Sequence, residues 1–114
     1  MICFWHGRAV SENRRLAPGE GRYRANKAYK AFKESVAWAC KLHLEHCEGP
    51  VSVRLFMDLN PRMDAQNVIK PVLDALELAG IINNDKQVRS FSFYREDRAA
   101  KEDDRIRILV QEVS

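Results

Sequence analysis

The amino-acid sequence predicts an α/β (α+β) domain in which two helices cover one face of a mixed four-stranded sheet. Four short stretches have the apolar content or the alternation of strands, and two longer stretches repeat apolar residues at helical spacing, in the order β-α-β-α-β-β. Two amphipathic helices bury their apolar faces most simply against one side of one sheet, which gives a fold of two layers.

The composition indicates one ordinary globular domain. The chain has 114 residues, of which 46% are apolar and 31% are charged, so we expect a single domain over residues 1–114. No apolar run is long enough to cross a bilayer, and the N-terminus MICFWHGR lacks the pattern of a signal peptide, so we expect no membrane partner. The three cysteines form no CxxC pair, which indicates reduced thiols in a cytoplasmic protein.

The first half of the chain predicts a strand, a loop and a helix. Ile2–His6 is a short apolar run typical of a strand, and residues 7–25 carry three glycines, a proline and five arginines, which predict a long basic loop. Asn26 can cap a helix that runs to about His46 and ends before Gly49. The predicted buried face of this helix is formed by Phe32, Val36, Cys40, His43 and Cys47.

The second half predicts a strand, a helix and a hairpin. Residues 51–58 alternate strictly, so one side of this strand meets the core and the other meets solvent or a partner. A loop at Asn60 leads to the second helix, which Gly80 ends. Residues 88–95 and 105–113 predict two strands joined as a hairpin through the stretch EDRAAKEDD. Two tryptophans are expected in the core, Trp5 and Trp38.

The second helix carries a polar stripe opposite its apolar face. At 100° per residue, Asn67, Lys70 and Asp74 fall together on the side away from the core. Asp64 precedes the helix, where its carboxylate can cap free N–H groups, and Asp74 follows Lys70 by four residues, so the two can pair. Taken singly, these side chains are explained better by capping and a surface ion pair than by a site. The predicted apolar face includes Val68, Val72 and Leu76.

Positive charge is concentrated at the N-terminal end. Residues 1–30 contain seven Lys or Arg against two Glu, whereas the net charge of the whole chain is +3. A basic segment followed by a segment rich in carboxylates suits a polyanionic substrate whose chemistry needs a metal. A solvated loop with charged helix ends explains the same composition equally well.

Residues 62–88, RMDAQNVIKPVLDALELAGIINNDKQV, resemble the signature of RusA-type Holliday-junction resolvases, which are crossover junction endodeoxyribonucleases. In that family an arginine-rich lead-in precedes D-x-D-N. A lysine follows three residues later, and then come L-D-A-L, a glycine and an acidic pair before a glutamine. Residues 11–36, SENRRLAPGEGRYRANKAYKAFKESV, resemble the N-terminal part of the family, so the similarity extends over nearly the whole chain.

The resemblance assigns roles to residues of this chain. It implies catalytic roles for Asp64, Asp85, Lys70 and Asp74. It implies metal binding by Asp64, Asp85 and Gln66, with Asn67 and Asn84 in support. Gln66 and Asn84 stand where the family has acids, and both replacements remove negative charge but keep a carbonyl oxygen. We therefore expect a weakened metal site rather than an absent one.

The implied protein is a RusA-like endonuclease, bacterial or phage-encoded, that resolves four-way DNA junctions in recombination and repair. The implied reaction is metal-dependent phosphodiester hydrolysis with Mg²⁺, or alternatively Mn²⁺, and the implied partners are branched DNA and a second subunit of a homodimer. The residues expected to bind DNA phosphates are Arg8, Asn13, Arg14, Arg15, Arg22, Arg24, Lys27 and Arg62.

Two alternatives remain open. The replacements at Gln66 and Asn84 also fit a RusA-like protein that binds branched DNA without cutting it. A zinc module is the second alternative, although the spacing resembles no zinc finger and a lone helix gives poor tetrahedral geometry. Its ligands would be Cys40, His43, His46 and Cys47.

Overall fold

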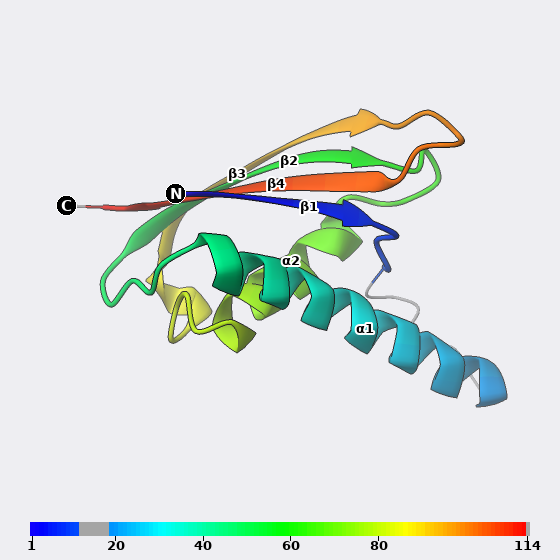
Figure 1. The fold of residues 1–114 in the computed structure, drawn as a ribbon, viewed down its shortest axis with the longest axis horizontal. Helices are drawn as coiled ribbons and strands as arrows, with labels where there is room; N and C mark the ends of the chain where they lie inside the picture. Colours follow the sequence, from blue (N-terminus) through cyan, green and yellow to red (C-terminus); the bar gives the residue numbers. More distant parts are fainter. Residues whose placement is uncertain (12–18, 114) are drawn as a thin grey trace.

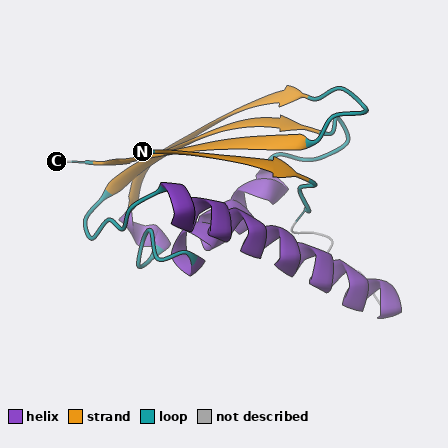
Figure 2. Ribbon diagram, viewed as in Figure 1, coloured by secondary structure: helices purple, strands orange, loops and turns teal. Residues whose placement is uncertain are grey.

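The computed structural model describes residues 1–11 and 19–113, with side chains described from residue 26 onwards in the first helix. Its elements are β1 (Ile2–Gly7), α1 (Gly19–His43), β2 (Val51–Leu59), α2 (Gln66–Leu78), the 3-10 helix η2 (Asp85–Gln87), β3 (Val88–Asp97) and β4 (Asp104–Glu112). Both α-helices lie beneath one face of the sheet (Figures 1 and 2), so the predicted α+β fold and its element order are confirmed.

The strands form one mixed sheet in the order β1-β4-β2-β3. β4 is antiparallel to both of its neighbours, and β3 is parallel to β2. The predicted β3–β4 hairpin is therefore wrong, because β2 lies between these two strands. After β2 the chain returns through α2 and enters β3, which runs parallel to β2. After β3 the chain crosses the end of β2, where the Arg98 N–H donates to the Leu59 carbonyl at 2.9 Å. β4 then fills the position between β1 and β2.

The core lies between the sheet and the helices, as the alternation predicts. In β2 the odd-numbered residues from Val51 to Leu59 are buried, while the even-numbered residues between them are partly or largely exposed. The predicted apolar face of α2 is buried as well, and burial of this apolar area is the main stabilising contribution to the fold. The remaining core residues include Phe32, Val36, Cys40, Ile106, Ile108 and Val110.

The first helix differs from its prediction at both ends. α1 begins at Gly19, seven residues before Asn26, so the predicted basic loop is wrong for residues 19–25, and residues 12–18 lie outside the described part of the chain. Glu20, Arg22, Arg24 and Ala25 are good helix formers, and their propensity outweighs that of Gly19 and Gly21. The helix ends at His43 rather than His46, because the following loop turns to bond the segment after α2.

Two residues expected in the core are on the surface. Trp38 is 64% exposed, because it projects from the side of α1 opposite Val36 and Cys40. His43 is also exposed, and Leu44, four residues after Cys40, takes the buried position instead. Trp5 is buried as predicted, and its indole N–H donates to Ser35 Oγ at 3.1 Å.

A buried carboxylate joins three segments at the end of the sheet. Asp104 is 2% exposed and opens β4. It accepts the N–H groups of Ala9 at 2.8 Å and Asn60 at 2.9 Å, and the Arg98 Nε–H donates to it at 2.6 Å. These bonds tie the chain after β1, the chain after β2 and the β3–β4 connection to one point.

We expect Asp104→Ala to lower the free energy of unfolding by about 3–5 kcal/mol, because it leaves the largely buried Arg98 without its carboxylate and the N–H groups of Ala9 and Asn60 without an acceptor. Urea denaturation followed by circular dichroism measures the change. Asp103→Ala, at the neighbouring exposed carboxylate, is the matched control and should change stability by less than about 0.5 kcal/mol. Equal stabilities of the two variants would show that the Asp104 bonds contribute little.

Candidate active site

The loop that leads into α2 is held from two sides. Within it, the Met63 N–H donates to the Asn60 carbonyl at 2.8 Å. From β3, the guanidinium of Arg95 donates to the carbonyls of Asn60, at 2.9 Å, and Met63. Asp64 follows, and its Oδ1 accepts the Gln66 N–H at 3.0 Å at the first residue of α2. The expected capping interaction of Asp64 is therefore present, and the Asp64 side chain is exposed at this helix end.

The polar stripe of α2 faces away from the core, as predicted. Lys70 Nζ donates to Asp74 Oδ1 at 2.8 Å, in a pair whose side chains are 48% and 28% exposed. The bond to Asp74 raises the pKa of Lys70 above its ordinary value of 10.5, and the charges of Asp85 and Glu77 act in the same direction. Lys70 is therefore a cation near neutral pH, suited to binding a phosphate rather than to accepting a proton. Asn67 is half-buried beside it.

Asp85 lies at the far end of α2. Its backbone N–H donates to Glu77 Oε1 at 2.7 Å, which places the first residue of η2 beside the last turn of the helix. Asn84 caps η2, with its side-chain oxygen accepting the Lys86 N–H at 2.8 Å. That oxygen therefore has a structural partner within the chain, which the sequence pattern does not reveal.

Gln87 holds the segment that carries Asp85. Its Oε1 accepts the N–H groups of Asn83 at 2.6 Å and Asn84 at 3.1 Å, and its Nε2 donates to the carbonyls of Cys47 at 2.8 Å and Gly49 at 2.9 Å. One amide thus fastens the turn before β3 to the loop before β2. Sequence reasoning did not give Gln87, Glu77 or Arg95 a role. Glu77 could have been found from the sequence, because it follows Lys70 by seven residues and so lies on the same face of the helix.

The structure does not gather the predicted metal ligands at one point. Asp64 caps the start of α2 while Asp85 is bonded to Glu77 near its end, and the eleven residue steps from Gln66 to Glu77 rise about 16 Å along the helix axis. In the described part of the chain, no group of three or more His, Cys, Asp or Glu side chains is placed to hold a metal ion. The predicted site is therefore an extended stripe with acids at both ends.

The start of α2 offers donors that suit a hard cation. Mg²⁺ in proteins often uses one or two carboxylates, with water and substrate phosphate completing the coordination. Asp64 supplies a carboxylate, and Gln66, two residues away, supplies an amide oxygen, and both residues are exposed. This donor set fits a weakly held magnesium ion.

Three of the eight predicted DNA-binding residues have described side chains. Arg8, Lys27 and Arg62 are exposed. Asn13, Arg14 and Arg15 lie outside the described residues, and Arg22 and Arg24 belong to α1 without described side chains. Arg8 precedes Ala9 and Arg62 follows Asn60, so the bonds of Asp104 bring these two cations to the same edge of the molecule as Asp64.

The zinc alternative finds no support in the described residues. Cys40 and Cys47 are fully buried. His46 is exposed, and its two ring nitrogens lie 2.6 Å from the Gly80 carbonyl and 2.6 Å from Glu48 Oε1. These side chains are directed to different partners and do not converge.

Comparison with known proteins agrees with this architecture. The model of the family described as "Endodeoxyribonuclease RusA" matches residues 7–111, which is nearly the whole chain. The protein belongs to the RusA family. Membership implies endodeoxyribonuclease activity on Holliday junctions, in a family of phages and bacteria that acts on DNA. No curated protein matches the chain. Among the described residues, no helix of this RusA-family protein has the length and apolar character needed to span a membrane.

The pair His46–Glu48 should make stability depend on pH. The Gly80 carbonyl and then Glu48 raise the pKa of His46 above its ordinary 6.5, so its stabilising contribution is complete below pH 6.5 and is lost as the pH rises through the raised value. The bond to His46 lowers the pKa of Glu48 below its ordinary 4.5, so that contribution is complete above pH 4.5 and is lost as the pH falls further.

We therefore expect the urea midpoint to fall between pH 5.5 and pH 8.5 by more in the wild type than in His46→Gln. Circular dichroism at the two pH values measures both midpoints. His43→Gln, at an exposed histidine on α1, is the control and should keep the wild-type difference. An identical pH dependence in all three proteins would contradict the role of His46.

Proposed function

We propose that this protein resolves four-way DNA junctions as a homodimeric, magnesium-dependent endonuclease. The observation that carries the proposal is the exposed Lys70–Asp74 pair on the outward side of α2, with Asp64 and Asp85 at the two ends of the same helix. Membership of the RusA family supplies the substrate class. A solvent-facing stripe of this kind, beside exposed arginines, suits a phosphodiester of DNA.

Each residue has a role that follows from its chemistry. Asp64, with the oxygen of Gln66, would hold Mg²⁺, which when bound activates water and stabilises negative charge on the phosphate. Lys70 supplies a fixed positive charge for the oxyanion that develops during hydrolysis. Asp74 orients the Lys70 ammonium through their 2.8 Å contact. Asn67, one turn earlier on the stripe, can donate to a phosphate or orient the Asp64 carboxylate.

The basic residues position the DNA without reading its sequence. Arg8 and Arg62 lie at the Asp64 end of the molecule, where they can bind backbone phosphates on either side of the cut. A four-way junction has two-fold character, and two symmetric cuts call for two sites related by symmetry. A homodimer would supply them.

The first test incubates the purified protein with a labelled four-way junction, with Mg²⁺, with Mn²⁺ and without metal. We expect paired, symmetric cuts that require metal. Asp64→Asn should reduce the cleavage rate by about a hundredfold or more and keep junction binding, because the carboxylate would hold the metal ion rather than bind the DNA phosphates. Glu34→Gln, which removes a charge from the exposed side of α1, should cut at the wild-type rate. Normal cleavage by Asp64→Asn would show that the site lies elsewhere.

The second candidate function is junction binding without cleavage. Two observations favour it: Gln66 carries no charge, and the Asn84 side chain caps η2. If the acid losses have abolished cutting, the wild type should bind junctions tightly without cutting them. The double variant Gln66→Asp, Asn84→Asp should then cut in Mg²⁺, and because aspartate caps a helix as well as asparagine does, η2 should remain intact. A double variant that binds and still fails to cut would exclude the loss of these acids as the cause.

A further inference from the structure

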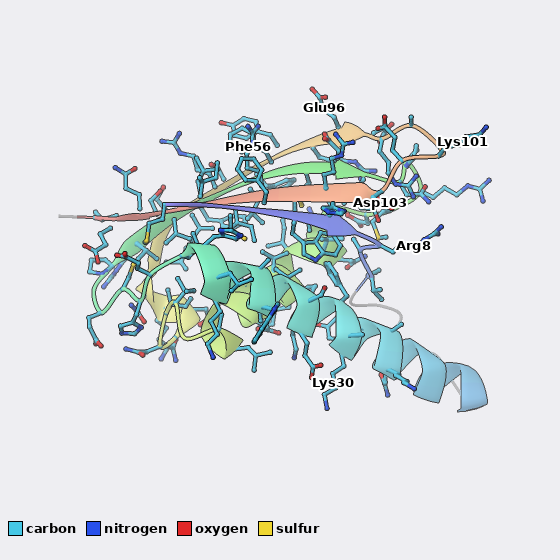
Figure 3. The ribbon with its side chains drawn as sticks, viewed as in Figure 1. Arg8, Lys30, Phe56, Glu96, Lys101 and Asp103 are labelled. Atoms are coloured by element: carbon cyan, nitrogen blue, oxygen red, sulfur yellow. The ribbon has the colours of Figure 1, made fainter. Side chains whose placement is uncertain are left out.

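The edge strand β3 carries an arginine on the side of the sheet that faces the helices. Glu96, labelled in Figure 3, points away from the helices, and side chains alternate along a strand, so Arg95 points toward them. The register agrees, because Arg95 pairs with Met57, which is buried in the core. Arg95 is half-buried, whereas Phe91 and Phe93, on the same side of the strand, are exposed. Arg95 is therefore part of the packed structure rather than a solvated surface charge.

The guanidinium of Arg95 bonds the loop that leads to Asp64. Its Nη2 donates to the Asn60 carbonyl at 2.9 Å, and its Nη1 donates to the Met63 carbonyl. Nη2 also donates to Asp97 Oδ1 at 3.2 Å. The two carbonyls belong to one turn, which the Met63 N–H closes onto the Asn60 carbonyl at 2.8 Å. A planar guanidinium can bridge two acceptors held in this way, whereas the ammonium of a lysine cannot hold the same geometry.

These bonds reach a part of the loop that Asp104 does not hold. Asp104 accepts the N–H of Asn60, at the beginning of the loop. Arg95 donates to the carbonyl of Met63, the residue directly before Asp64. Because a peptide unit is planar, fixing this carbonyl also fixes the N–H and the Cα of Asp64. The direction in which the Asp64 side chain leaves the backbone is therefore set from β3.

The orientation of the Asp64 carboxylate matters because one of its oxygens is already used. Oδ1 accepts the Gln66 N–H at 3.0 Å, which leaves Oδ2 to bind a cation together with the side-chain oxygen of Gln66. Mg²⁺ demands near-octahedral geometry, so its affinity depends on where each ligand stands. Gln66 adds no charge. The site therefore depends more on the placement of its one carboxylate than a site built only from acids would.

We propose that Arg95 is a positioning residue for cleavage, which acts through Asp64 by fixing the peptide between residues 63 and 64. This role rests on the proposed function. Arg95 contacts neither metal nor DNA in it, since three of its N–H bonds are directed at Asn60, Met63 and Asp97. A ligand held in place before the metal binds needs no further ordering, and its supporting residues decide how well it is placed.

Amide hydrogen exchange, measured by NMR on the full chain without metal or DNA, tests whether Arg95 holds this loop. Arg95→Lys keeps the positive charge but cannot bridge both carbonyls, so the Met63 and Gln66 amides should exchange about tenfold faster or more. The amides of the central strands β2 and β4 should keep their wild-type rates. Arg89→Lys, the same change at an exposed position of β3, is the matched control and should leave all of these rates unchanged.

Junction cleavage in Mg²⁺ then tests the effect on the reaction. We expect Arg95→Lys to lower the single-turnover cleavage rate about tenfold or more, because a displacement of about 1 Å at a reacting group can cost a hundredfold. The Kd for the junction should stay within about twofold, since the lysine keeps the charge. In the Asp64→Asn background, Arg95→Lys should cause no further loss, because the carboxylate through which it acts is already absent. Arg89→Lys should keep the wild-type rate and Kd.

Several outcomes would overturn the proposal. Unchanged exchange at Gln66 in Arg95→Lys would show that Arg95 does not hold the loop, and equal acceleration in the central strands would make it a general structural residue. A weaker junction Kd at an unchanged rate would assign Arg95 to DNA binding. A further tenfold loss in the Asp64→Asn background would show that it acts independently of Asp64. A wild type that cuts no junction would contradict the proposed nuclease, and the exchange rates would still decide whether Arg95 positions Asp64.

Discussion

The buried carboxylate of Asp104 is the interaction on which the placement of the site depends. Its two oxygens accept N–H groups from the chains leaving β1 and β2, and its charge is balanced by Arg98 from the β3–β4 connection. A backbone N–H group buried without an acceptor would be costly, so these segments have little freedom to separate. The start of α2 and the chain around Arg8 are therefore fixed at the same end of the molecule.

The other end of α2 is fixed by a second, more solvent-exposed set of bonds. Gln87 fastens the turn before β3 to the loop before β2, and His46 binds the carbonyl at the end of α2. Between the two anchors, the polar stripe is carried on a rigid helix rather than on a loop. Lys70 is bonded to Asp74 and also lies in the field of the Glu77 and Asp85 charges, so in the proposed reaction a DNA phosphate would compete with carboxylates for Lys70. A bound divalent cation that neutralises part of this negative charge would favour the phosphate.

The sequence predicted periodic features well and spatial neighbours poorly. The alternation in residues 51–58 identified the buried and exposed faces of β2 because side-chain direction is a local property. The β3–β4 hairpin was wrong because strand pairing depends on the path of the whole chain. Trp38 was misplaced because hydrophobicity alone does not locate a residue on its helix face. The family signature identified the candidate residues, but adjacency in a motif did not reveal that Asp64 and Asp85 lie at opposite ends of α2.

The anchored end of the sheet connects the candidate site to the basic residues beside it. Arg8 follows β1 directly, and Arg62 lies in the same loop as Asp64, two residues after the Asp104-anchored Asn60. Because Asp104 bonds both Ala9 and Asn60, the two cations are set at the same end of the molecule as the start of α2. A phosphate chain that reaches Asp64 would therefore meet positive charge on this end without any rearrangement of the fold.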